Sequence, residues 1–332
     1  MNLKLNRLSF LTRQVADSKA QPSAAPVPSP FGSARTRNRR TPGARLRRET
    51  LLSGADAEVV RQACTGLLER LTQSESLNLR QLLLPLYIQS LRSESVRGDA
   101  LGVWRREDET FWLSRFHFRR PGAGEKRIKV GIFAGIHGDE PAGILGLMDF
   151  IRELDMTPEL GKHFDLWLYP ACNPTGCVAG TRHSWSGRDL NREFWRGSME
   201  REVILLENEL RAQRFDGIIS LHSDDTAEGF YGYARGSVLS KQLLQPALNA
   251  AARAQARDPR PFIDGFRAVN GIIHDSYDGI LSAPPGQSPR PFEIILESPA
   301  RSPLEDQRRA ICLALDSVLA EYRRFISYGA DL

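Results

Sequence analysis

The sequence predicts an α/β fold, with a mixed and mostly parallel β-sheet covered by helices on both faces. From residue 127 onward, short apolar runs alternate with longer amphipathic segments. Such alternation is typical of strands joined by helical crossovers. Several of the apolar runs also end in polar residues, which is how sites are built at the carboxyl edge of such sheets.

The first 50 residues differ in composition from the rest and are expected to form a disordered basic tail rich in Arg, Pro and Ser. Residues 1–48 hold eleven Lys and Arg but one acid, Asp17, which leaves 34 of the 45 basic and 39 of the 40 acidic residues for the remainder. The pI of about 9.2 therefore comes from the tail, and we do not expect the folded part to bind nucleic acid. An organelle transit peptide and a basic arm for nucleic acid or anionic membrane remain alternatives for the tail.

We expect residues 51–332 to form a single catalytic domain, with N-terminal helices and a β-hairpin over 51–120 and a catalytic core over 121–332. Apolar spacing of three and four predicts two helices within 55–95, separated around 74–76. Apolar residues at 103–104 and the alternation over 111–118 predict an antiparallel strand pair.

The core is predicted to alternate regularly between strands and helices. The expected strands cover residues 127–134, 164–169, 217–221 and 292–296. The expected helices cover residues 142–154, 199–214, 240–257 and 302–325.

Cysteine usage and hydropathy bear on the compartment. The four cysteines show no spacing typical of a disulfide framework, which favours a reduced, cytoplasmic setting. An organelle is the alternative if the tail is a transit peptide. We find no run of 18 apolar residues and so expect no membrane span.

Four predicted strands end in residues that could carry chemistry. His137 and Glu140 follow the first strand, Asn173 and Pro174 follow the second, His222 ends the third, and Glu297 ends the fourth. Two imidazoles and one carboxylate would make a three-ligand zinc set with an open fourth position. For any single histidine at a strand end, a structural hydrogen bond is the alternative.

The polar segment 180–194 is predicted to be a long loop, and long loops in compact domains are often functional. Arg182, Arg188 and Arg192 could bind a carboxylate through paired hydrogen bonds. Solvated loop arginines are the alternative. The proline-rich loop 283–291 could border a substrate pocket or simply connect two elements.

Together these motifs resemble the zinc carboxypeptidase superfamily, and especially its succinylglutamate desuccinylase/aspartoacylase-like branch, over roughly residues 125–325. The motifs that carry the resemblance are His137-Gly-Asp-Glu140, Asn173-Pro-x-Gly176, Arg182 with Asp189-Leu-Asn-Arg192, Ser220-Leu-His-Ser223 and Leu296-Glu-Ser-Pro299. Residues 1–120 show no such motif.

The resemblance implies a role for each matching residue. His137, Glu140 and His222 would bind one Zn²⁺ per chain, and Glu297 would be the general base. Arg182 would polarise the scissile carbonyl, whereas Asn191 and Arg192 would grip a substrate carboxylate. Asp189 would orient the loop or a ligand. Tyr277 is a looser match to a substrate-capping tyrosine, with a plain loop tyrosine as the alternative.

The chemistry expected from this set is hydrolysis of an amide bond next to a free carboxylate, in a peptide C-terminus or an N-acyl amino acid. Two features depart from enzymes that act on small N-acyl amino acids. After Glu297 only one helix is expected, where those enzymes often carry a β-rich domain, and residues 226–292 show no specificity motif. An ester or cell-wall peptide substrate and a non-catalytic metal-binding module remain alternatives, and the oligomeric state is left open.

Overall fold

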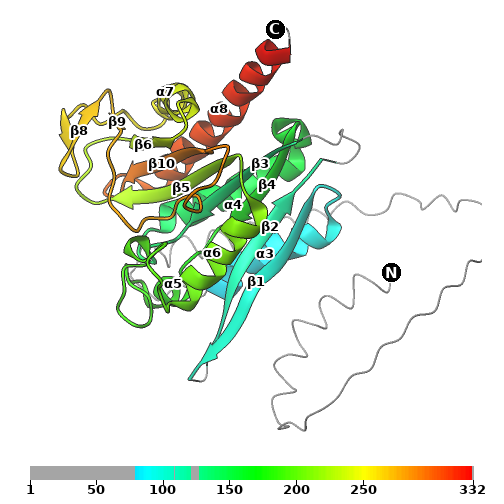
Figure 1. Cartoon of the computed structure of the whole chain (residues 1–332). Helices are drawn as coiled ribbons and strands as arrows, with labels where there is room; N and C mark the ends of the chain where they lie inside the picture. The colour runs from blue at the N-terminus through cyan, green and yellow to red at the C-terminus, as the bar shows by residue number, and fades with distance from the viewer. Residues whose placement is uncertain (1–78, 108, 121–126, 331–332) are drawn as a thin grey trace, which may run out of the picture. The chain divides into compact units, whose positions relative to one another are not determined.

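A computed structural model of the chain describes residues 79–107, 109–120 and 127–330, with side chains to residue 327 (Figure 1). The expected tail over 1–50, the domain boundary after it and the first of the two helices predicted within 55–95 lie outside the described residues. The second is present as α3 (Leu79–Arg92). No helix within the described ranges is long and apolar enough to cross a membrane.

The described residues form one ten-stranded sheet in the order β1-β2-β4-β3-β5-β10-β6-β9-β8-β7. Its strands are β1 (Val96–Arg106), β2 (Glu109–Phe118), β3 (Ile128–Ala134), β4 (Phe164–Tyr169), β5 (Gly217–Asp224), β6 (Tyr231–Gly236), β7 (Phe262–Ile263), β8 (Phe266–Val269), β9 (Ile272–Ile273) and β10 (Phe292–Pro299). The four central strands β4, β3, β5 and β10 run parallel, whereas β1, β2 and β6 add antiparallel pairs. The predicted mixed, mostly parallel sheet is confirmed, and so is the antiparallel β1–β2 pair.

Helices cover both faces of the sheet (Figure 1). The other helices are α4 (Pro141–Met156), α5 (Pro174–Ala179), α6 (Arg201–Gln213), α7 (Leu239–Ala251) and α8 (Leu304–Ala330), with 3-10 turns η1 (Pro158–Gly161) and η2 (Leu190–Arg192). One apolar cluster packs α3, α4, α7 and α8 against one face of the sheet. A second cluster packs α6 against the opposite face. Burial on both faces explains why the central strands are continuous apolar runs without alternation.

Two of the predicted strands are longer than the apolar runs indicate. β5 continues to Asp224 and β10 continues to Pro299, so His222 and Glu297 lie within strands and not beyond their ends. Both extensions are paired with each other, from Leu296 opposite Leu221 to Pro299 opposite Asp224. Ladder hydrogen bonds thus keep polar residues extended where hydropathy alone indicates an end.

The segment between β5 and β10 holds the largest differences from the prediction. Helix α7 ends at Ala251 and not at residue 257, because the chain then turns and Arg257 forms a parallel bridge with Phe230. Strand β6 and the short strands β7, β8 and β9 were not predicted. The aromatic-rich run Phe230-Tyr-Gly-Tyr-Ala234 was the available sequence signal for β6.

Asp316 on α8 offers a test of the helix packing. Burial, aided by the nearby charge of Glu153, raises the pKa of its carboxyl to about 6, and one carboxyl oxygen has no hydrogen-bond partner among the described residues. Because this carboxyl has a higher pKa in the folded state than in the unfolded state, the protein loses stability as pH rises from about 4 through 6. At pH 7.5 the free energy of unfolding of Asp316→Asn should therefore exceed that of the parent by about 1 kcal/mol, after allowance for solvent screening. The variant should accordingly unfold at a higher temperature. Thermal unfolding at pH 4 should show little difference, and an equal gain at both pH values would contradict the assignment.

Candidate metal centre

Three residues meet at the carboxyl edge of the sheet, two from the segment after β3 and one from the neighbouring parallel strand β5. His137 lies in the turn after β3, and Glu140 is the residue that precedes the first turn of α4. His222 lies in β5, which pairs directly with β3. Pro141 at the first position of α4 suits the helix start, because its missing N–H would have no partner there.

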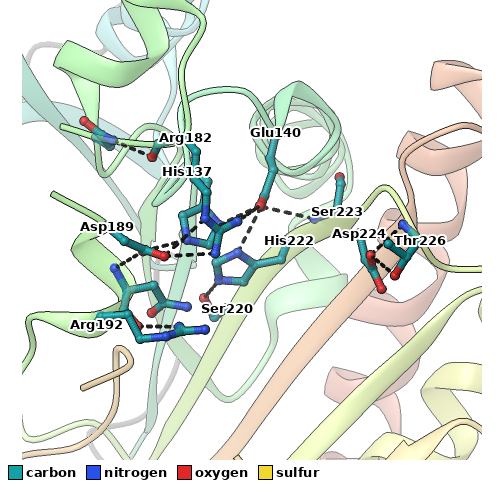
Figure 2. A network of polar contacts seen from close by, with 12 residues as sticks. His137, Glu140, Arg182, Asp189, Arg192, Ser220, His222, Ser223, Asp224 and Thr226 are labelled. Atoms are coloured by element: carbon teal, nitrogen blue, oxygen red, sulfur yellow. Dashed lines mark hydrogen bonds and ion pairs between the residues drawn. The ribbon is translucent and has the colours of Figure 1, made fainter. Parts of the chain in front are cut away.

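The three side chains are turned toward one another (Figure 2). His137 Nδ1 lies 2.5 Å from Glu140 Oε1, and His222 Nδ1 lies 2.9 Å from Glu140 Oε2. All three residues are buried, and their candidate ligand atoms lie within 4.8 Å of one another. This is the one group of three or more His, Cys, Asp or Glu with such spacing in the part of the chain that the structure describes.

The outward ring nitrogens of both histidines have their own partners. His137 Nε2 lies 3.0 Å from Asp189 Oδ1, and His222 Nε2 lies 2.9 Å from Ser220 Oγ. A proton on each Nε2 leaves the Nδ1 lone pair free to face Glu140. Outer partners of this kind fix the tautomer and orientation of histidines that bind metals. Ser220 was not singled out as a site residue from the sequence, although it lies within the Ser-Leu-His-Ser motif.

Charge keeps the central carboxylate ionised. Burial alone would raise the pKa of Glu140, but His222 and His137 outweigh that effect and lower it to about 2. Burial conversely lowers the pKa of His137, and the Glu140 and Asp189 carboxylates raise it to about 9. The pKa of His222 is lowered, mainly by burial. The backbone N–H of Ser223 also donates to Glu140 Oε2 at 3.1 Å.

This donor set fits a divalent metal ion. Two imidazole nitrogens, deprotonated when a metal binds, and one carboxylate are the ligand types that Zn²⁺ and other first-row divalent ions accept. The set converges from a turn, a helix start and a strand that the fold holds independently. The sequence-predicted ligands are therefore brought together by the structure.

Glu297 lies beside this cluster. It pairs directly with His222 across the β5–β10 ladder, and directly paired residues project to the same face of a sheet. Burial, and then the negative charges of Glu140 and Asp224, raise the pKa of its carboxyl well above the usual range. A carboxylate whose pKa is raised is a stronger base than an exposed one, which suits it to accept a proton.

Arg182 approaches the cluster from the polar loop between α5 and α6. Its Nη1 donates toward His137 Nδ1 at 3.2 Å, and Nη1 lies 3.6 Å from Glu140 Oε1. Its Nε and Nη2 donate to Asp189 Oδ2 at 3.1 and 3.0 Å. Asp189 thus joins the arginine to His137, while its other oxygen also accepts the N–H of Asn191 at 2.9 Å.

Asn191, Arg192 and Tyr277 form a second group close to the first. The side-chain oxygen of Asn191 accepts the N–H of Leu281 at 2.9 Å, which leaves its amide nitrogen as the end that could donate to a ligand. The Arg192 guanidinium lies 4.2 Å from the centre of the Tyr277 ring, a cation–π contact. The Tyr277 hydroxyl donates to the Asp264 side chain at 3.1 Å, so Tyr277 supports Arg192 in this conformation. Arg188, in contrast, is exposed and lies 3.6 Å from Glu193.

Close packing explains the glycine after His137. A Cβ on Gly138 would lie 2.0 Å from the carbonyl carbon of Gly176, so the turn that carries His137 rests directly on the backbone of α5. Asn173 caps α5 by accepting the Gly176 N–H at 2.8 Å, and its amide nitrogen donates to the Arg182 carbonyl at 3.4 Å. The Asn-Pro-x-Gly motif therefore joins the His137 turn to the arginine loop.

Replacement of Asp189 by Asn should weaken metal binding without unfolding the protein. Loss of its charge removes an ionised partner from His137 Nε2 and from Arg182. Removal of such an outer partner typically costs 10–100-fold in metal affinity or activity. Titration with Zn²⁺ against a competing chelator measures this, with the exposed Asp278→Asn as the charge-matched control. An unchanged zinc affinity would contradict the role of Asp189.

Comparison with known proteins agrees with this geometry. Residues 126–259 match the family model of the succinylglutamate desuccinylase/aspartoacylase catalytic domain, which confirms the resemblance found in the sequence. No match was found among curated proteins.

Solved structures share the fold at low sequence identity. A putative metallopeptidase from Shewanella amazonensis has a TM-score of 0.63 at 23% identity, covering 73% of this chain and 92% of its own. A metallo-carboxypeptidase from Burkholderia cenocepacia has a TM-score of 0.57 at 19% identity, covering 74% and 69%. A metallo-carboxypeptidase from Pseudomonas aeruginosa, solved in complex with (2-guanidinoethylmercapto)succinic acid, has a TM-score of 0.54 at 20% identity, covering 73% and 68%.

Proposed function

We propose that this chain is a zinc-dependent hydrolase that cleaves an amide bond next to a free carboxylate. The match of residues 126–259 to the succinylglutamate desuccinylase/aspartoacylase catalytic-domain model supports this proposal. Its substrate would be a peptide C-terminus or an N-acyl amino acid. The observation that carries the proposal is the direct pairing of Glu297 with His222, one of three buried residues that converge as candidate metal ligands.

His137, Glu140 and His222 would hold the ion, which supplies Lewis-acid chemistry and lowers the pKa of water. Glu297 would accept the proton of the attacking water and return it to the leaving nitrogen. Burial and nearby negative charge raise its pKa, which makes the carboxylate a stronger proton acceptor than an exposed one and supports the first transfer. Arg182 would stabilise negative charge that develops on the carbonyl oxygen, and its contacts with Asp189 hold it in place for that task.

Asn191 and Arg192 would bind the free carboxylate of the substrate. The guanidinium is a strong donor to carboxylates, and the contact with Tyr277 limits the orientations that it can take. The ligand of the Pseudomonas aeruginosa enzyme also fits this chemistry, since its succinic acid part carries two carboxyl groups.

The proposal is tested by hydrolysis of two substrate panels, C-terminally free peptides and N-acyl amino acids, with purified full-length protein. Activity should require a free carboxylate, disappear after chelation and return on addition of Zn²⁺. Amidated or esterified analogues are the matched controls. A zinc-replete protein inert toward both panels would contradict the proposal, and turnover of esters alone would favour the alternative ester substrate.

Arg192→Met should raise KM at least about tenfold, with a smaller effect on kcat, because a lost charge-assisted contact to the carboxylate weakens binding of substrate and transition state alike. Steady-state kinetics on the best substrate measure the split. Arg188→Met removes an exposed arginine from the same loop and serves as the control. Equal effects of the two variants would contradict the assignment of Arg192.

A further inference from the structure

A cavity lies between β6, the start of α7 and the loop after β9. Its volume is about 590 Å³, which is within the range of small-molecule sites. The charged or polar residues that line it are Arg235, Ser237, Lys241, His274, Asp275, Ser276 and Arg290. We refer to it as the basic cavity. Arg290 comes from the proline-rich loop 283–291, which the sequence left open as a pocket border or a simple connection.

The basic cavity is remote from the candidate metal centre. On the β6–β10 ladder, Gly236 at the cavity pairs with Phe292, whereas Tyr231 pairs with Glu297. Five residues of extended strand separate Tyr231 from Gly236, which corresponds to roughly 17 Å. The β6 side of the basic cavity is therefore distant from Glu297, whereas Ser276, on another side of the cavity, directly precedes Tyr277 in the chain.

The charges of the basic cavity are unbalanced. It presents Arg235, Lys241 and Arg290 against one acid, Asp275. Within the described ranges, none of these three cations forms an ion pair. Arg235 Nη1 is buried and has no hydrogen-bond partner there. Buried donors are normally satisfied, so this N–H is an exception among the described residues, and Arg235 itself lines the cavity.

The start of α7 places the positive end of a helix dipole beside the cavity. Ser237 and Val238, which precede α7, line the cavity, and no side chain caps this helix. Ser240, which could have capped it, instead donates its hydroxyl to the Arg235 carbonyl and accepts the N–H of Glu293 at 3.0 Å. The N–H groups of Ser237 and Ser240 donate to the Pro291 and Ser237 carbonyls, so it is the positive end of the helix dipole that favours an anion here.

From these observations we propose that the basic cavity binds a small phosphate-bearing molecule, such as a phosphate monoester. Three cations facing one carboxylate leave a surplus of positive charge that matches a dianion. A phosphoryl group offers several acceptor oxygens to separate donors from Arg235, Lys241 and Arg290, beside the positive end of α7. The cavity exceeds the size of a single phosphate, which leaves room for the organic part of a monoester.

The test is isothermal titration calorimetry, which gives a Kd for each ligand. The zinc-loaded, full-length protein is titrated at constant ionic strength with inorganic phosphate, glycerol 3-phosphate and succinate. We expect both phosphates to bind, with glycerol 3-phosphate the tighter. Lys241→Ala combined with Arg290→Gln should raise their Kd at least about tenfold, because it removes two charge-assisted contacts. Both residues are exposed, so the folded structure should tolerate the change. Arg301→Gln combined with Arg309→Gln removes the same net charge from exposed positions outside the cavity and should leave the Kd unchanged.

Three outcomes would overturn the proposal. The first is the absence of phosphate binding by the parent protein. The second is phosphate binding that survives the cavity variant but is lost in His222→Ala, which would place the anion at the metal centre. The third is succinate binding that is as tight as phosphate binding and equally weakened by the cavity variant, which would assign the site to carboxylates. Hydrolytic activity enters none of these readouts, so the test is independent of the proposed function.

Discussion

Glu297→Gln is expected to lower kcat by about 10²–10⁴-fold on the best amide substrate, the range typical of a lost general base. The amide keeps the shape of the carboxyl but cannot accept the proton of the attacking water. The pairing of residue 297 with His222 should persist, because it is made by backbone atoms of β5 and β10. Steady-state kinetics give kcat, and elemental analysis gives the zinc content.

The zinc content and unfolding temperature of Glu297→Gln should match those of the parent. Glu305→Gln, at an exposed position near the start of α8, is the control for loss of one carboxylate. The role of Glu297 would be contradicted by a variant that keeps its zinc and its turnover. A variant that loses its zinc would instead show that Glu297 supports the metal centre and would leave proton transfer to another group.

His222→Ala is expected to abolish both zinc retention and hydrolysis. The change removes one of two imidazoles that face Glu140, which leaves that buried carboxylate with fewer favourable partners. The loss in zinc affinity should exceed the 10–100-fold expected for an outer partner such as Asp189. Competition with a chromophoric chelator measures the affinity, and chelated parent protein provides the reference for activity.

Two controls separate ligand loss from general damage. Ser220→Ala removes only the partner of His222 Nε2 and should cost less zinc affinity than His222→Ala. His163→Asn changes an exposed histidine with a φ of 76°, a backbone conformation that Asn tolerates. Full zinc content in His222→Ala, or equal losses in all three variants, would contradict the proposed ligand set.

Much of the core could be predicted from the sequence because its elements are local patterns. The strands over 128–134 and 164–169 are apolar runs with clear flanks, and α4 begins at a proline. The ends of β5 and β10 could not be predicted in the same way. Their last residues are polar, and only pairing with each other keeps them extended. Strands β7, β8 and β9 are two to four residues long, too short for periodicity to reveal them.

The sequence also determined which residue types are available for chemistry. Histidines and carboxylates occur at or just after the ends of three predicted strands. They are His137, Glu140, His222 and Glu297. Their motifs reflect the ligand and proton-transfer chemistry of individual side chains. These properties do not depend on the rest of the fold.

Only the tertiary structure decided how those residues are held. In the fold, the Nδ1 atoms of both histidines face Glu140. Asp189 contacts the other ring nitrogen of His137, and Ser220 contacts that of His222. Arg192 stacks on the ring of Tyr277. The fold likewise gathers Arg235, Lys241 and Arg290 around one cavity. Strand register and side-chain direction are set by packing between segments far apart in the chain, so no local pattern could show which donors face one another.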